Sequence, residues 1–362
     1  MRRALIGILA LAIGLGGAAW LALRIPALQD RLVERALDRQ LADSPERLFE
    51  ADALRVLLCG TSSPFPHATR AKPCVAVFAG GAVYAVDVGP GSWNRMALWR
   101  IDGQRIGAVL LTHFHSDHIG ELGEWNLQTW VAGRAGPLRV FGPPGVERVV
   151  AGFEQAYALD TGYRVAHHGA ELLPPERARM RARAVSGPAS GSGPETFLEE
   201  DGLRITAFAV DHEPVRPAYG YRFDYGGRSL VVSGDTVKSQ ALVEAARDAD
   251  VLVHEAQANH LVARIRDAAL RANRPRVAKI MGDIPDYHSS PVEAAQAANE
   301  AGVKLLVLTH LTPPPPVELV ERVFVRGVDD VRRGDWILGD DGLLVELPLG
   351  SGELRIEALP AP

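Results

Sequence analysis

The sequence predicts an α/β fold in which two layers of β-sheet pack together. From residue 54 onward, short apolar runs bounded by glycine and proline recur, and their length and β-branched content are typical of strands. Segments with a helical spacing of apolar residues lie between many of these runs. The runs are too numerous for one ordinary open sheet, so we expect two sheets.

The strand candidates are the runs 54–59, 74–80, 82–89, 106–113, 138–143, 203–210, 219–223, 229–235, 251–255, 304–310, 342–348 and 354–359. The main helix candidates cover residues 91–100, 119–132, 145–159, 238–246 and 291–301. With 362 residues, of which 47% are hydrophobic, the chain can bury a large core. Its net charge of -5 shows none of the basic excess that is typical of a dedicated nucleic-acid binder.

Residues 1–26 predict a membrane anchor or a signal segment. Two arginines, Arg2 and Arg3, precede an uncharged run over residues 4–23, which at about 1.5 Å per residue can cross about 30 Å of bilayer hydrocarbon. The run lacks a clear small-x-small cleavage site, which favours an uncleaved anchor over a signal peptide. Arginines on both sides leave the orientation open, and we expect the body of the protein to be exported, either anchored or periplasmic.

Residues 27–50 carry apolar side chains at helical spacing among charged ones and predict an amphipathic juxtamembrane helix or linker. Residues 51–362 form the remaining domain. The two cysteines, Cys59 and Cys74, flank a predicted hairpin. They could form a bridge in an oxidising compartment or remain two buried thiols, and the sequence does not decide between these states.

The strongest functional signal is the stretch 110–122, LLTHFHSDHIGEL, at the end of a predicted strand. His113 and His115 share a direction in an extended turn, and Asp117 and His118 start the helix that follows. Four residues of metal-ligand type in six positions predict a metal site. One metal could take both imidazoles of the turn, and a second could take Asp117 and His118.

Three more candidate ligands follow later strands. His212 comes after LRITAFAV, Asp235 after SLVVSG and His310 after KLLVLT. An aspartate between two cations can bridge them through its two oxygens. We therefore expect a two-metal site in which Asp235 is the shared ligand.

With these motifs the chain resembles the metallo-β-lactamase fold superfamily, and within it the branch of ribonuclease Z and the arylsulfatase-like hydrolases. The matching motifs are GTSSPFP at 60–66, HxHxDH at 113–118, His212 before the GYRF strand, SGDT at 233–236, HEA at 254–256 and the run 288–310. The resemblance implies a four-layer αβ/βα sandwich for residues 51–362, with the site at one edge, and a hydrolase activity.

The resemblance also assigns roles to the candidate residues. It places one Zn²⁺ on His113, His115 and His212, a second on Asp117, His118 and His310, and Asp235 between them; other divalent metals fit the same ligands. Two such ions would generate hydroxide from water. Asp117 would also orient that hydroxide, His288 would face the substrate, and His254 would orient ligands or relay protons.

These roles predict a dinuclear zinc hydrolase of small anionic esters, with an arylsulfate or a phosphodiester as substrate. The alternative is a tRNA 3′-processing nuclease like ribonuclease Z. The membrane segment, the acidic net charge and the lack of a basic, glycine-rich arm argue against it and against a nucleic-acid partner. A lactone or thioester hydrolase and a catalytically silent metal-binding scaffold are further alternatives, and a homodimer is left open.

Overall fold

The computed structural model describes residues 20, 23–40, 45–189 and 191–360. The chain divides into two compact units, Met1–Ser44 and Pro45–Pro362. In the first unit, helix α2 (Pro26–Gln40) covers the first part of the predicted amphipathic helix. At the other end of the predicted helix or linker 27–50, the 3-10 turn η1 (Glu46–Phe49) belongs to the second unit and buries Leu48 and Phe49.

The predicted membrane segment, residues 4–23, lies almost wholly outside the described residues. No helix in the described part of the chain combines the length and the apolar character needed to cross a bilayer.

The second unit contains two sheets, of eight and seven strands. In spatial order the first sheet consists of β15 (Arg355–Ala358), β14 (Leu343–Pro348), β1 (Ala53–Gly60), β2 (Cys74–Ala79), β3 (Ala82–Val86), β4 (Ile106–Leu110), β5 (Leu138–Gly142) and β6 (Met180–Ala184). The second sheet consists of β13 (Asp335–Leu338), β12 (Leu305–Thr312), β11 (Val251–Gln257), β10 (Arg228–Val232), β9 (Ala218–Tyr225), β8 (Leu203–Val210) and β7 (Glu195–Glu200).

Each sheet combines a parallel half with an antiparallel half. Strands β3 to β6 pair in parallel, as do β10 to β13, and the other pairs are antiparallel. The HxHxDH turn follows the parallel strand β4, Asp235 follows β10, and His310 lies near the end of β12, whereas His212 follows the antiparallel strand β8. Ligand sites of α/β proteins are typically found at these strand ends.

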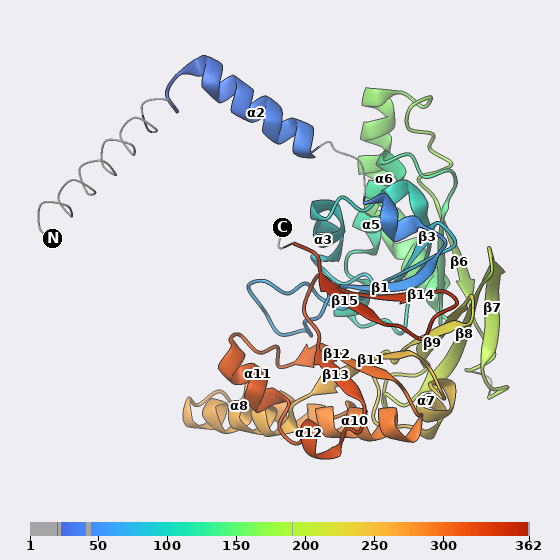
Figure 1. Ribbon diagram of the computed structural model, residues 1–362. Coiled ribbons are helices and arrows are strands. Elements are labelled where there is room, and N and C mark those ends of the chain that lie inside the picture. Colours follow the sequence, from blue (N-terminus) through green and yellow to red (C-terminus); the bar gives the residue numbers. More distant parts are fainter. Residues whose placement is uncertain (1–19, 21–22, 41–44, 190, 361–362) are drawn as a thin grey trace, which may run out of the picture. The chain divides into compact units, whose positions relative to one another are not determined.

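Helices cover the outer faces of both sheets (Figure 1). The first sheet is covered by α3 (Ser92–Leu98), α5 (Leu122–Val131) and α6 (Val146–His168). The second is covered by α7 (Gln240–Ala245), α10 (Pro291–Glu300), α11 (Glu318–Phe324) and α12 (Val328–Val331). The remaining elements are α4 (Ser116–Ile119), α8 (Asn259–Arg271), α9 (Pro275–Asp283), η2 (Gly103–Arg105) and η3 (Ile284–Asp286).

Three hydrophobic cores separate these layers. The central core lies between the sheets and joins Val77 and Leu110 of the first to Tyr221 and Val253 of the second. The second core lies under α3, α5 and α6, and the third lies under α7 and α10. The predicted α/β fold with two layers of sheet is therefore confirmed.

All twelve predicted strands are present, but three strands escaped prediction. The missed strands β6, β7 and β13 lie at sheet edges, where one side of the strand is unpaired. Edge strands tolerate charged side chains, and the sequences MRARA and ETFLEE of β6 and β7 lack the apolar runs that mark central strands. Helices α8, α9, α11 and α12 were also missed.

A disulfide joins Cys59 and Cys74 at the paired ends of β1 and β2, with an S–S distance of 1.96 Å. Of the two states that the sequence leaves open, the structure contains the bridge. It closes the loop from Gly60 to Pro73. Within this loop the Lys72 ammonium donates hydrogen bonds to the carbonyls of Ser63 and Phe65.

Candidate metal centre

The HxHxDH turn is anchored by a carboxylate that the sequence analysis did not single out. Asp87 follows β3, and its Oδ1 accepts the backbone N–H of Thr112 at 2.8 Å. Its Oδ2 accepts the Thr112 hydroxyl and lies 2.8 Å from His118 Nδ1. His118 Nδ1 therefore acts as the donor, and Nε2 is left free to face the centre. The sequence feature that could have identified Asp87 is its position directly after the apolar run AVYAV.

The three distant candidates are positioned by their own backbone surroundings. His212 Nδ1 donates to the carbonyl of Tyr287 at 2.9 Å, which leaves its Nε2 free. His310 lies where the register of β11 and β12 shifts, because Glu255 pairs with Thr309 and Ala256 with Leu311. At this bulge His310 has φ 45°, a left-handed conformation that non-glycine residues adopt only when the surroundings enforce it.

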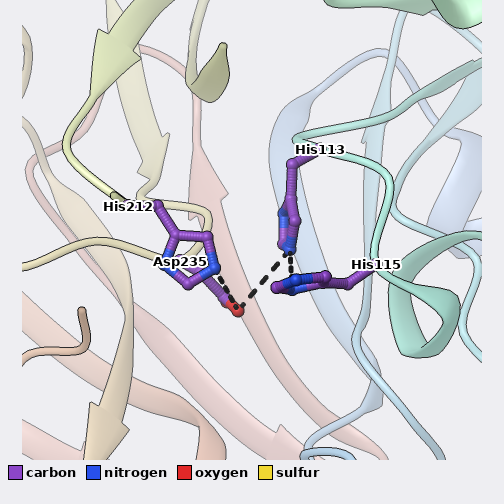
Figure 2. Close-up of side chains that lie close together, drawn as sticks. All are labelled: His113, His115, His212 and Asp235. Carbon is purple, nitrogen blue, oxygen red and sulfur yellow. Dashed lines mark hydrogen bonds and ion pairs between the residues drawn. The ribbon is translucent and has the colours of Figure 1, made fainter. Parts of the chain in front are cut away.

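The seven predicted ligands lie together with Asp235 at their centre, and Figure 2 shows part of this group. Asp235 Oδ2 lies 3.3 Å from Nε2 of both His118 and His310, and 3.8 Å from Nε2 of both His113 and His212. Two groups have ligand atoms within 4.8 Å of one another: the first contains His113, His115, His212 and Asp235, and the second contains Asp117, His118 and His310. His115 is half-buried and the other six are buried.

Buried atoms without partners show that these residues fit a metal. Among the described residues, Asp117 Oδ2 and the Nε2 atoms of His118, His212 and His310 have no hydrogen-bond partner. Leaving such atoms unpaired costs about 1–3 kcal/mol each. Coordination of a cation would satisfy all four, and imidazole and carboxylate donors suit zinc.

The pKa shifts of the carboxylates also fit a site for a cation. Burial raises the pKa of Asp117, but the charges of His118 and His310 outweigh it and lower the pKa to about 2. The pKa of Asp235 is also well below its usual value, because these histidines outweigh its burial. Burial opposes the protonation of His118, yet Asp235 and Asp87 raise its pKa well above the usual value. The carboxylates around His118 therefore favour positive charge at this position, which a bound cation would supply.

His288 lies against the same centre and is held by Glu255. Its Nδ1 donates to Glu255 Oε1 at 2.9 Å, and its ligand atom lies within 4.8 Å of those of Asp235 and His310. Burial lowers the pKa of His288, but the charge and hydrogen bond of Glu255 raise it to about 9. Directly after His288, a capping box between Ser290 and Glu293 begins α10.

His254, which we expect to orient ligands or relay protons, lies beside Glu255 in β11 and is fully buried. Its Nδ1 donates to the carbonyl of Glu255 at 2.7 Å, its Nε2 has no partner among the described residues, and no candidate metal group there includes it. Glu255 instead accepts from His288 Nδ1, the Thr236 N–H and the Ser289 N–H. Successive side chains of a strand point to opposite faces, so His254 and Glu255 cannot both face the centre.

This fold and this convergence of histidines and aspartates define a metal-dependent hydrolase of the metallo-β-lactamase class. The family model described as the beta-lactamase superfamily domain matches residues 85–311, and the chain belongs to that superfamily. Within it the chain belongs to the ribonuclease Z branch. It is 40% identical to ribonuclease Z of Mycobacterium bovis over 263 residues, which cover 72% of this chain and 86% of that protein. Ribonuclease Z of Mycolicibacterium gilvum is 39% identical over 265 residues, covering 72% and 85%.

Solved structures share the fold at lower identity. The metallo-β-lactamase fold protein YhfI from Bacillus subtilis superposes with a TM-score of 0.58 at 20% identity, covering 82% of this chain and all of that one. The short form of human tRNase Z superposes with a TM-score of 0.55 at 20% identity, covering 81% and 99%.

These comparisons contradict two expectations about partners. We expected a small anionic ester as substrate and argued against nucleic acid. Both expectations are wrong, because the curated relatives that cover most of the chain are named as ribonuclease Z. The comparisons do not support the predicted arylsulfatase-like activity.

Proposed function

We propose that the protein is a dinuclear zinc phosphodiesterase that cleaves RNA, with the 3′ end of a precursor tRNA as the first substrate to test. The observation that carries the proposal is the clustering of six candidate ligands around Asp235, with His288 beside them. The identity to ribonuclease Z supports RNA as the substrate class.

In this proposal His113, His115 and His212 hold one Zn²⁺, Asp117, His118 and His310 hold the other, and Asp235 contributes to both. Such a pair supplies Lewis acidity towards a phosphodiester oxygen and lowers the pKa of a water molecule. The geometry supports a shared role for Asp235, since its Oδ2 lies within 3.8 Å of imidazole nitrogens from both groups.

The residues of the chain supply orientation and proton transfer. Asp117 stays ionised because its pKa is near 2, so its carboxylate can accept a hydrogen bond from the attacking water and orient it. Glu255 holds His288 by Nδ1, which leaves His288 Nε2 as the atom that can reach the substrate. As an imidazolium, His288 would stabilise the charge on the phosphate oxygens or protonate the leaving oxygen.

The test uses full-length protein freed of metal and then supplied with Zn²⁺, together with a precursor tRNA that carries a 3′ extension. We expect cleavage that depends on zinc and is lost in Asp235→Asn. The matched control is Asp330→Asn, which removes an exposed carboxylate in α12 and should cleave at the wild-type rate. A wild-type protein that binds two zinc ions and cleaves no RNA would refute the proposal.

A further inference from the structure

The helical hairpin formed by α8 and α9 concentrates positive charge outside the metal centre. Its cationic residues are Arg264, Arg266, Arg271, Arg274, Arg276 and Lys279, and its acidic residues are Asp267 and Asp283. All eight side chains are exposed. This local excess of cations stands in a chain whose net charge is -5.

Most of these cations are not neutralised by neighbours. Arg266 pairs with Asp267 at 2.9 Å, and Lys279 pairs with Asp283 at 2.5 Å. For the other four arginines, no carboxylate of the described residues lies within ion-pair distance. Arginines that are exposed and without acidic partners are free to bind phosphate, and their planar guanidinium groups match its oxygens.

The hairpin is joined directly to the metal centre. The chain leaves the centre at Glu255, forms the hairpin and returns at His288. Gln257 Nε2 donates to the carbonyl of Ile284 at 3.0 Å, which ties the two ends together. Buried residues of the hairpin pack against Phe65 and Tyr287.

Tyr287 links this packing to the site. The centroid of its half-buried ring lies 4.8 Å from that of His212 and 4.6 Å from that of His288. A substrate strand that leaves the metal centre on this side would meet Tyr287 first and the hairpin next. An aromatic ring in this position can stack on a nucleobase.

We infer that the α8–α9 hairpin is the docking surface for the phosphate backbone of the RNA substrate. The inference rests on the proposed function. It specifies the surface on which the RNA lies beyond the cleaved bond. Backbone contacts of this kind fix the register of a nucleic acid, and Tyr287 contributes a contact to a base near the cleaved bond.

A lipid surface is the competing partner, because Leu270, Val277 and Ile280 are exposed beside the cations. The buried face of each helix, however, packs on the protein itself through Val262 and Ala269 in α8 and through Ala278 and Met281 in α9. A helix that lies in a membrane interface needs its main apolar face free. The surface that remains is mainly charged, which favours a phosphate backbone.

The test compares full-length wild type with R264Q/R271Q/R276Q, and with R148Q/R181Q/R247Q, which removes three exposed arginines elsewhere. The probe is the labelled, 3′-extended precursor tRNA, and binding is measured by fluorescence anisotropy between 50 and 300 mM salt. Losing three phosphate contacts should weaken binding roughly 10–100-fold and reduce the slope of log K against log salt by about 2–3. R264K/R271K/R276K should retain most of that slope, and an unchanged melting temperature shows that each variant is folded.

The outcomes separate the inference from the proposed function. Equal weakening in both Gln variants would show a nonspecific effect of net charge and overturn the inference. Unchanged RNA affinity in the hairpin variant would also overturn it, and salt-dependent loss of binding to phosphatidylglycerol vesicles in that variant alone would assign the surface to lipid. Failure of the wild type to cleave the RNA would instead refute the proposed function.

Discussion

Breaking the disulfide between Cys59 and Cys74 should destabilise the fold by a calculable amount without disabling the metal centre. The bridge spans a separation of 15 residues, for which the lost loop-closure entropy of the unfolded chain corresponds to about 3 kcal/mol. The compact unit Pro45–Pro362 contains about 320 residues, so its unfolding entropy is about 0.7 kcal/mol per kelvin. The melting temperature should therefore fall by about 4–5 °C.

The assay is scanning calorimetry on oxidised wild type, reduced wild type and the double variant Cys59→Ala, Cys74→Ala. Because the chain has two cysteines, thiol titration should give no free thiol before reduction and two after it. Neither sulfur belongs to the metal groups, and Lys72 still holds the loop carbonyls, so zinc binding at 25 °C should persist. Two free thiols in the oxidised protein, or an identical melting temperature for all three samples, would refute this reasoning.

Four further predictions concern the centre. Zn²⁺ at 100 times its Kd should stabilise the metal-free protein by about 2.7 kcal/mol, which raises the melting temperature by roughly 4 °C in scanning calorimetry. The same rise in Asp235→Asn would contradict the role of Asp235 as a shared ligand. Asp117→Ala should reduce kcat for RNA by about 100-fold or more with a smaller effect on stability, and an unchanged rate would rule out its role in orienting water. Glu255→Gln replaces charge-assisted hydrogen bonds by neutral ones, weaker by about 1 kcal/mol each, so kcat should fall roughly tenfold with unchanged metal content. His254→Asn should lower the melting temperature and change kcat for RNA comparatively little.

The central strands and the cluster of candidate ligands were predictable because each carries its own local signal. A strand buried on both faces has to be apolar along its whole length, so the run IGAVLL is recognisable without knowledge of its neighbours. The ligands His113 to His118 gather within six positions, and His212, Asp235 and His310 each follow such a run.

The supporting residues were harder to predict because their roles depend on contacts between distant segments. Asp87 precedes His118 by 31 positions, and nothing in the sequence between them shows that the two side chains meet. The hydrogen bond between Glu255 and His288, 33 positions apart, has the same origin. The face that each residue of β11 presents is set by the pairing of β11 with β10 and β12, and a shift of one residue would reverse it.

The mistaken argument against nucleic acid also comes from averaging over the whole chain. A net charge of -5 describes the total, whereas binding of a phosphate backbone depends on the field within about 8–10 Å of the contact at physiological salt. The α8–α9 hairpin holds six cations and two carboxylates in 25 consecutive positions, from Asn259 to Asp283. Acidic residues on other faces are largely screened from that surface, so they can set the sign of the net charge without preventing a polyanion from binding there.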